Sequence, residues 1–330
     1  MNVLLTGGAG YIGSVLTQEL LNAGYNVTVF DTFYFGEKPL EDVKENIQMI
    51  KGDIRKMPSH VLEGIDAVID LAAIPNDPVG DLNPVLTHSI NHNGRVNVAR
   101  LCKKMGVKQY IAPSSGSNYG MSDGWVDETT PANPLTVYSQ ANYAWEQEIL
   151  PLADKNFCVT IIRQSTVYGY SPKMRFDIIV NDFTMQAFVN KKIKIKGNGM
   201  EWRPFVHIKD DCQAMLKILS APPELINGEL FNIGSNEQSV QIKTALDKIT
   251  KSLGFDCPVE YGDLVDKRDY KMSCEKIKKV LGFKAKFMIE DGAKEIYAAL
   301  QDGRLKADDP TTMTLKWYKI LMDKDIMDLI

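Results

Sequence analysis

The sequence predicts an α/β protein with a doubly wound parallel sheet and a second, smaller mixed α/β domain. Short apolar runs, among them residues 2–5, 26–30 and 109–115, alternate with segments of helical periodicity. That alternation is typical of βαβ units and a parallel sheet. Beyond residue 165 the apolar runs become shorter and less regular, which indicates a smaller domain of different construction.

We therefore expect residues 1–165 to form the first domain and residues 166–330 to form mainly the second, with part of the later chain returning to the first. In the second half, the periodicity predicts helices over residues 176–190 and 239–253. Apolar residues at helical spacing within residues 314–330 predict a final helix that packs on the body of the protein or on a second subunit.

The composition limits the classes of function. The 330 residues are 44% hydrophobic and 24% charged, with a net charge of -4 and no dense run of Lys or Arg. Nucleic acids and anionic membranes need a concentrated basic surface, so neither is expected as a partner. The five cysteines form no CxxC pair, which indicates neither a disulfide framework nor a zinc site. With no basic leader and no apolar run of ~20 residues, the sequence predicts a soluble cytoplasmic protein.

Three evenly spaced glycines follow the first predicted strand. The segment NVLLTGGAGYIGS places Gly7, Gly10 and Gly13 between a strand and a helix. Glycines at this spacing permit a tight turn, a close approach of the backbone to a pyrophosphate, and close packing of helix on strand. An ordinary strand-to-helix turn also accepts glycines, but the position after the first strand favours a Rossmann dinucleotide loop. We expect Tyr11 and Ile12, inside this loop, to contact the cofactor as well.

Asp31 ends the second predicted strand. A carboxylate at this place can accept hydrogen bonds from both hydroxyls of an adenosine ribose, and its charge would repel a 2′-phosphate. The residues that follow, TFYF, supply no arginine to reverse that preference. The sequence therefore favours NAD over NADP.

Two further segments are candidates for the adenine and ribose part of the site. Asp53 and Ile54 follow an apolar stretch and could edge the adenine, although such an aspartate taken alone is more often a turn residue. Leu71, Ala72 and Ala73 end a buried strand, where small residues would let a cofactor pass close by or would serve packing alone.

Several motifs in a fixed order carry a family resemblance. After the glycine loop and the two aspartates come LAA, PSSGSNYG, YSQAN, RQSTVYG and FNIGS. With these motifs, the chain resembles the extended short-chain dehydrogenase/reductases, in particular the nucleotide-sugar epimerases and dehydratases, over nearly its whole length. The resemblance implies NAD as cofactor, a nucleotide-diphosphate sugar as substrate, and a homodimer formed through two helices of the cofactor domain.

The resemblance also implies roles for individual residues. Tyr138 matches the catalytic tyrosine that takes the proton of a sugar hydroxyl while hydride passes to the nicotinamide. Ser115 matches the serine or threonine that hydrogen-bonds this hydroxyl, with Ser117 beside it. Asn142 stands where relatives carry a lysine, four residues after the tyrosine.

Five more residues match positions that contact ligands or support them. Arg203 and Arg268 match the arginines that grip the diphosphate, for which a planar guanidinium is suited. Thr166 stands where many relatives carry an asparagine that contacts the substrate, and Asn181 is a candidate donor to phosphate or nucleotide. Asn91 matches a polar position on a helix under the cofactor site, although a surface asparagine would fit the pattern equally well.

The asparagine at position 142 limits what the site can do. The usual lysine lies on the same helix face as the tyrosine, where its charge favours tyrosinate and its donors bind the nicotinamide ribose. Asn142 could perform only the second task. A unit charge at ~5 Å and an effective dielectric of ~20 contributes about 3 kcal/mol, so a rate loss of order a hundredfold is expected. The asparagine is a tolerated natural substitution, a natural loss of activity, or an engineered change.

The function that best fits these features is an NAD-dependent epimerase that oxidises a ring carbon, such as C4, to a transient ketone and reduces it again. A nucleotide-sugar reductase or dehydrogenase of the same fold is the first alternative, and a catalytically weak protein that binds NAD and sugar nucleotide is the second. Dehydratases of this family place an Asp-Glu pair after the catalytic Ser or Thr. Gly116 and Ser117 follow Ser115 here, which disfavours dehydration.

Overall fold

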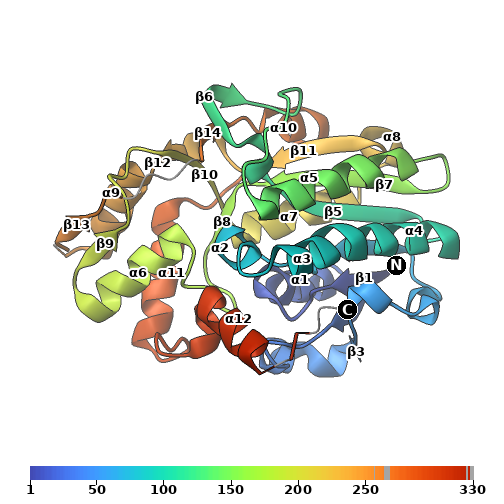
Figure 1. The fold of residues 1–330 in the computed structure, drawn as a ribbon, viewed down its shortest axis with the longest axis horizontal. Helices are drawn as coiled ribbons and strands as arrows, with labels where there is room; N and C mark the ends of the chain where they lie inside the picture. Colours follow the sequence, from blue (N-terminus) through green and yellow to red (C-terminus); the bar gives the residue numbers. More distant parts are fainter. Residues whose placement is uncertain (256, 264–267, 325, 328–330) are drawn as a thin grey trace.

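A parallel sheet forms the centre of the computed structural model, which describes residues 1–255, 257–263, 268–324 and 326–327. In this part of the chain the sheet has seven strands, in the order β11-β7-β5-β4-β1-β2-β3, and every pairing is parallel (Figure 1). The strands are β1 (Asn2–Thr6), β2 (Asn26–Asp31), β3 (Ile47–Lys51), β4 (Ala67–Asp70), β5 (Gln109–Ser115), β7 (Cys158–Gln164) and β11 (Glu229–Ile233). The predicted doubly wound α/β fold is confirmed.

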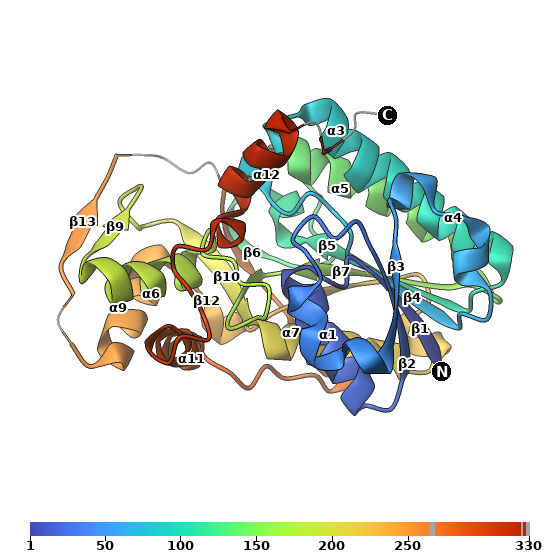
Figure 2. The same ribbon diagram turned by 90° about the horizontal axis from the view of Figure 1, so that it is seen from below.

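Alternate side chains of the strands feed two cores on opposite faces of the sheet. Leu4, Val68 and Tyr110 pack on the face covered by α4 (Arg95–Met105) and α5 (Val137–Ile149). Their neighbours along the strands, such as Leu5, Ile69 and Ile111, pack on the other face, which α1 (Tyr11–Asn22) and α7 (Ile208–Leu219) cover (Figure 2). Successive strand residues point to opposite faces, so near-continuous apolar runs give a sheet buried on both sides.

The remaining strands form smaller sheets, and all of them except β6 come from the second half of the chain. The pairings are β12-β10-β8, β13-β9 and β14-β6. These strands are β6 (Met121–Val126), β8 (Thr166–Tyr168), β9 (Ile193–Ile195), β10 (Trp202–His207), β12 (Ser239–Gln241), β13 (Val259–Tyr261) and β14 (Asp269–Met272). The remaining helices are α2 (Asp77–Gly80), α3 (Pro84–His88), α6 (Ile179–Asn190), α8 (Pro223–Ile226), α9 (Ile242–Leu253), α10 (Glu275–Leu281), α11 (Ile289–Gln301) and α12 (Thr314–Asp323).

Two helices of the second half begin later than predicted. The helix expected over residues 239–253 begins at Ile242, because residues 239–241 form β12 and pair antiparallel with β10. The helix expected over residues 176–190 begins at Ile179, and Phe176 is instead bonded through its N–H to the carbonyl of Thr312. In both cases the first residues of the predicted helix instead form backbone hydrogen bonds with a segment distant in the sequence.

The helix α12 lies against the first half of the chain. Tyr318 and Leu321 join an apolar cluster with Ile74, Val79 and Leu86, from the segment that follows β4. The indole Nε1 of Trp317 donates a hydrogen bond to the carbonyl of Tyr34 at 2.9 Å. Residues 325 and 328–330 of the predicted final helix lie outside the described residues.

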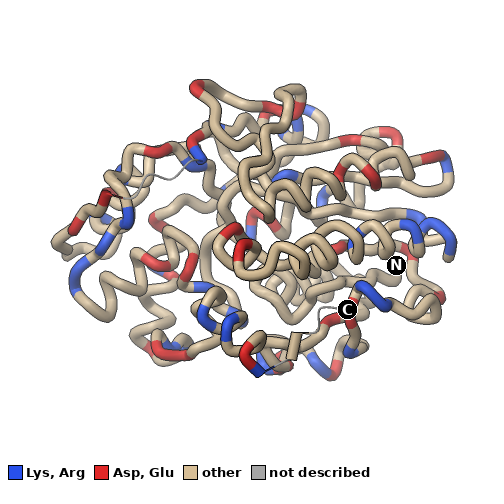
Figure 3. The backbone as a smooth tube through the Cα atoms, viewed as in Figure 1, with Lys and Arg blue, Asp and Glu red and all other residues tan. Residues whose placement is uncertain are grey.

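The surface carries charges of both signs. Figure 3 shows Lys and Arg interspersed with Asp and Glu along the backbone in this view. No helix within the described ranges is both long enough and apolar enough to cross a membrane. All five cysteines are buried, and Cys102, Cys158, Cys212 and Cys274 form no disulfide. The described residues include no group of three His, Cys, Asp or Glu placed to hold a metal ion.

Candidate active site

The predicted phosphate loop joins β1 to α1. Gly7 has a φ of +69°, and a Cβ there would lie 2.8 Å from the backbone N of Ala72. A Cβ on Gly13 would lie 2.2 Å from the carbonyl oxygen of Gly7. Gly10 caps α1, whose first turn contains no acidic residue. The loop therefore needs its glycines for backbone shape and close packing, and it leaves the positive end of a helix open to an anion.

Asp31 stands at the end of β2, beside this loop. Its carboxylate accepts hydrogen bonds from the N–H of Ala9 at 3.0 Å and from the N–H of Phe33 at 2.7 Å. Burial raises the pKa of the carboxyl, and the backbone donors oppose that shift. Asp31 lines a small cavity of about 110 Å³, which also touches Gly7 and Gly10. The place and exposure of the carboxylate suit contact with a ribose next to the phosphate loop.

The other residues predicted near the adenine mostly line the same small cavity. Asp53, Ile54 and the segment Leu71–Ala73 all form part of its wall. The carboxylate of Asp53 is paired with Arg55, whose Nη2 lies 2.5 Å from Oδ2. This carboxylate is therefore a structural anchor for the turn that presents Ile54.

A larger cavity of about 810 Å³ adjoins the phosphate loop and lies between the two halves of the chain. Its wall includes Gly10, Tyr11 and Ile12 on one side and Ser115 and Tyr138 on another. The second half of the chain closes it with Thr166, Arg175, Arg203, Arg268 and Tyr270. The cavity thus brings together residues that lie more than 200 positions apart in the sequence.

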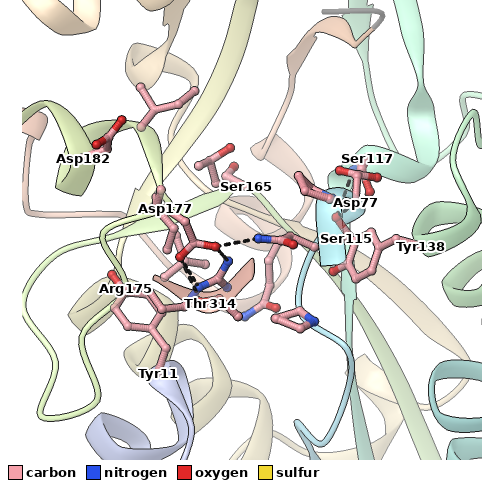
Figure 4. Close-up of a pocket in the computed structure, with 18 of the residues that line it drawn as sticks. Tyr11, Asp77, Ser115, Ser117, Tyr138, Ser165, Arg175, Asp177, Asp182 and Thr314 are labelled. Atoms are coloured by element: carbon pink, nitrogen blue, oxygen red, sulfur yellow. Dashed lines mark hydrogen bonds and ion pairs between the residues drawn. The ribbon is translucent and has the colours of Figure 1, made fainter. Parts of the chain in front are cut away.

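Ser115 and Tyr138 meet at this wall, as Figure 4 shows. Ser115 ends β5, and its Oγ lies 2.8 Å from the Oγ of Ser117. Tyr138 lies in the first turn of α5, which Thr136 and Ser139 start with a capping box. A hydrogen bond joins the Ser115 and Tyr138 side chains. A hydroxyl group of a ligand in the cavity could therefore reach both oxygens at once.

The groups around Tyr138 have opposing effects on the pKa of its phenol. Burial raises the pKa of the phenol above its ordinary value, and the carboxylate of Asp77 raises it further. The hydrogen bond to Ser115 and the charges of Arg95 and Arg175 lower the pKa. The balance stays on the raised side, so Tyr138 is mainly a phenol at neutral pH and needs help to act as a base.

Asn142 lies one turn beyond Tyr138 on α5 and is 1% exposed. Its Oδ1 accepts a hydrogen bond from Nη1 of Arg95 at 3.3 Å, while its Nδ2 has no hydrogen-bond partner among the described residues. Asn142 is not part of the wall of either cavity described above, whereas Arg95 is part of the larger one. Farther along α5, Glu146 binds Arg163 of β7 at 2.7 Å, which anchors the helix to the sheet.

The two predicted phosphate-binding arginines lie on the substrate side of the cavity. Arg203 of β10 is 4% exposed, and its Nη1 donates to the carbonyls of Trp202 and Arg268. Arg268 forms an ion pair with Asp77 of α2, so it spans the cavity from the second half of the chain to the first. An anionic group bound here would compete with Asp77 for the Arg268 guanidinium.

Two asparagines predicted to contact ligands are used inside the protein instead. Both polar atoms of Asn91 bond the backbone of Ile74, at 2.7 and 2.9 Å, so this residue fixes the segment after β4. Asn181 binds the N–H of Gly169 and donates to the hydroxyl of Tyr11. Neither is part of the wall of the two cavities. A buried amide needs all its partners, and here the fold supplies them.

Some residues of the cavity wall were not singled out from the sequence. They are Phe35, Asp77, Arg95, Lys173, Arg175 and Tyr318. Lys173 is 4% exposed, and its Nζ lies 3.7 Å from the centroid of the Phe35 ring. Burial, with the charge of Arg175, lowers the pKa of Lys173 to about 7. In the sequence, Lys173 and Arg175 are the two basic residues of the segment SPKMRFD, which begins two positions after the motif RQSTVYG.

Comparisons with known proteins agree with this geometry. Residues 3–234 match the model of the NAD dependent epimerase/dehydratase family. A putative UDP-glucose 4-epimerase of Methanocaldococcus jannaschii is 28% identical over 89% of this chain and 96% of that protein. The dTDP-D-glucose 4,6-dehydratase of Mus musculus is 30% identical over 89% of this chain and 86% of that protein.

A solved structure extends the similarity to the fold. The UDP-glucuronic acid 4-epimerase of Bacillus cereus, in complex with UDP-glucuronic acid and NAD, is 27% identical, covers 92% of this chain and 99% of its own, and has a TM-score of 0.79. Together with the matched family model, this identifies the chain as a member of the NAD dependent epimerase/dehydratase family, within the extended short-chain dehydrogenase/reductases, whose cofactor is NAD.

Proposed function

We propose that this protein is an NAD-dependent nucleotide-sugar 4-epimerase. The observation that carries the proposal is one cavity whose wall holds the phosphate loop, the Ser115 and Tyr138 pair, and the two arginines Arg203 and Arg268. The relatives described as UDP-glucose 4-epimerase and UDP-glucuronic acid 4-epimerase support the same reaction class. The test below identifies the nucleotide and the sugar that this cavity accepts and the product that forms.

The residues present fit NAD. The helix α1 directs free N–H groups and no acidic side chain toward the phosphate loop, which suits a pyrophosphate. Asp31 and the small cavity beside it suit the adenosine, and Lys173 and Arg175 add cations to the larger cavity. When bound, NAD accepts a hydride from the sugar carbon and returns it.

The chain's own groups handle the proton and the orientation of the sugar. Ser115 orients the sugar hydroxyl, and Tyr138 takes its proton as the carbon is oxidised and gives one back as the ketone is reduced. Arg203 and Arg268 hold the diphosphate while the sugar ring presents its other face. For the configuration at the carbon to be inverted, the diphosphate must therefore stay bound to the two arginines while the sugar ring rotates.

The site disfavours dehydration for a steric reason. A Cβ on Gly116 would lie 3.0 Å from Sδ of Met272 and 3.1 Å from the carbonyl oxygen of Gln164. A side chain directly after Ser115 would therefore need the Met272 side chain or the Gln164 carbonyl to move by a few tenths of an ångström. The position where dehydratases of the family carry an aspartate is tightly packed here, which supports epimerisation over elimination.

The test of the function is an assay of the purified protein with a panel of nucleotide sugars that includes UDP-glucose, UDP-glucuronic acid and dTDP-glucose. Proton NMR of the products is expected to show inversion at C4, with no net change in the absorbance of reduced nicotinamide. Tyr138→Phe should abolish the inversion. Steady consumption of added NAD would support the reductase or dehydrogenase alternative, and NAD binding without turnover of any sugar would support the weak binding protein.

We also propose that the protein acts as a homodimer in a reducing cytoplasm. The buried cysteines Cys102, Cys158, Cys212 and Cys274, which form no disulfide, support the reducing compartment. The dimer rests on the exposed faces of α4 and α5, and its test is given below.

A further inference from the structure

A buried arginine lies beside the position where relatives carry the lysine. Arg95 is the first residue of α4 and is 1% exposed. Its Nη1 donates to Oδ1 of Asn142 at 3.3 Å, one helical turn from Tyr138. Arg95 also shares the wall of the larger cavity with Ser115 and Tyr138. A positive charge is therefore present at this wall, although α5 does not supply it.

The protein fixes the position of this guanidinium from several sides. Nη2 of Arg95 donates to the carbonyls of Asp70 at 2.6 Å and Pro113 at 2.7 Å, on the neighbouring strands β4 and β5. Its Cζ lies 3.3 Å from the centroid of the Trp145 ring on α5. A planar guanidinium is suited to such stacking and to several donors in one plane. The charge thus has one position, between the ends of two strands and α5.

The nearest carboxylate lies on the far side of the guanidinium from Asn142. Asp70 Oδ2 is 3.5 Å from Nε of Arg95, which is longer than an ordinary hydrogen bond. The two oxygens of Asp70 accept from Thr6 Oγ1 and from the hydroxyl of Tyr110. Nε faces Asp70 and Nη1 faces Asn142, so the Nη1 side of the charged guanidinium lies against α5.

We propose that Arg95 and Asn142 together replace the missing lysine. Arg95 supplies the positive charge that favours the tyrosinate form of Tyr138, and Asn142 holds the Arg95 guanidinium beside α5 by accepting its hydrogen bond at Oδ1. Arg95 acts through its field and through Asn142, which makes it a positioning residue. The proposal rests on the proposed function.

The electrostatics of Tyr138 agree with this geometry. Burial and Asp77 raise the pKa of the phenol, and Ser115, Arg95 and Arg175 lower it. Arg95 is the cation that comes from the same side of Tyr138 as the lysine of relatives would, through its contact with Asn142.

The proposal has a consequence that separates it from a simple loss of activity. If Asn142 merely weakened the site, Asn142→Lys would restore activity. If Arg95 already holds the charge, Asn142→Lys places two cations within hydrogen-bond distance in a buried site, where like charges are costly. The single change should then bring no gain, and the lysine should become useful only after Arg95 is removed.

The experiment compares Arg95→Met, Arg95→Lys, Asn142→Lys and the double variant Arg95→Met with Asn142→Lys. Arg95→Met should lower kcat at least about tenfold and move the rising limb of the kcat profile to higher pH, while NAD affinity changes less than about threefold. Arg95→Lys and the double variant should recover most of the rate. A rise in kcat for Asn142→Lys alone, or no recovery in the double variant, would overturn the proposal.

Arg163→Met is the matched control for folding. Arg163 is also buried and paired with a carboxylate, and its Cζ lies 4.7 Å from the centroid of the Tyr119 ring, yet it is absent from the wall of the larger cavity. Both methionine variants should unfold at lower temperature than the parent protein. Only Arg95→Met should displace the pH profile, and an equal displacement in Arg163→Met would assign the effect to general destabilisation.

A second readout keeps the proposal separate from the choice of reaction. The tyrosinate absorbance of the NAD-bound protein is titrated against pH, and the signal of Tyr138 is isolated by subtracting Tyr138→Phe. Tyr138 should ionise at lower pH in the parent protein than in Arg95→Met. Identical titrations would refute the role of Arg95, even if no nucleotide sugar has been found that the protein turns over. Conversely, a displaced titration without turnover would contradict the proposed function alone.

Discussion

Asp31 is the residue that decides between the two nicotinamide dinucleotides. Its carboxylate is held by the N–H groups of Ala9 and Phe33. Asp31→Asn keeps an acceptor for these bonds and removes the charge that would repel a 2′-phosphate. The ratio of NADP to NAD affinity should rise roughly tenfold, or about 1.4 kcal/mol. Calorimetry with both dinucleotides measures it, and the exposed Asp42, changed to Asn, controls for net charge. An unchanged ratio would contradict the assignment.

Lys173 should take up a proton when the phosphates of NAD bind near it. Its pKa is lowered to about 7 by burial and by Arg175, while Asp177 and Asp309 act in the opposite direction. At pH 8 the free amine is therefore mainly neutral. A pyrophosphate nearby favours the ammonium form and raises the pKa, so NAD binding should take up about 0.5–1 proton at this pH.

Calorimetry of NAD binding in two buffers with different ionisation enthalpies counts these protons. The uptake should fall as the pH drops below 7, because Lys173 is then charged before the cofactor binds. Lys173→Met should remove most of the uptake. If that variant takes up as many protons as the parent protein, the proton goes to another group.

Residue roles that depend on local backbone shape could be read from the sequence, and those that depend on tertiary contacts could not. The glycine loop follows from spacing, since each glycine meets backbone within a few residues or in the adjacent strand. Asn181 gave no such signal, because its partners Gly169 and Tyr11 come from separate segments. Arg95 likewise becomes a candidate only when α4 is placed beside Asn142.

The last helix, α12, also contributes to the expected cofactor site. Thr314 and Tyr318 line the larger cavity, and Tyr318 also lines the smaller one. Tyr318 and Leu321 are the buried contacts of α12 with the segment after β4. The helix therefore covers part of the place where NAD is expected to bind, and it should slow the release of the cofactor.

Undocking α12 tests this relation. Tyr318→Ser with Leu321→Ser removes two buried apolar contacts, each of which contributes roughly 1.5–3 kcal/mol when fully buried. The dissociation rate of NAD should increase at least about tenfold, as measured by stopped-flow displacement. The exposed Lys319 on the same helix, changed to Ser, should leave the rate unchanged. Equal rates in all three proteins would show that α12 does not retain the cofactor.

The limits of prediction at this scale follow from pairing. The sequence placed the inner strands β1, β5 and β7 well, because each is an apolar run of largely buried residues. It placed the end of β4 too late, since the strand ends at Asp70 and Leu71–Ala73 follow it, and it assigned the segment of β11 to the smaller domain, although β11 pairs with β7 in the central sheet. It placed the start of α9 three residues early, since Ser239–Gln241 continue the helical pattern but pair with β10. A strand partner that is distant in the sequence gives no local pattern. The short strand β12 was therefore predicted as part of the following helix.

At the scale of the whole molecule, the homodimer remains a prediction, and we expect its interface to be formed by the exposed faces of α4 and α5. Gln140 and Gln147 are exposed on α5, and Ala144 lies between them on the same face; Asn97 and Arg100 are exposed on α4. Light scattering should give twice the mass of the chain. Ala144→Arg should give a monomer, because a large charged group cannot be packed at the centre of a helix interface. Glu224→Arg, at an exposed position of α8, is the control and should stay dimeric.

The cavity wall also sets an order of events during synthesis. Its members run from Gly7 in the first loop to Tyr318 in α12, and β11 must join the sheet from the middle of the second half. A ribosome therefore completes the phosphate loop long before the residues that close the wall exist. Because contacts of large sequence separation form late in folding, the nascent chain has a loop shaped for phosphate but no enclosure to retain a cofactor. NAD should be captured only after Tyr318 has left the ribosome, so cofactor loading becomes the last step of biogenesis.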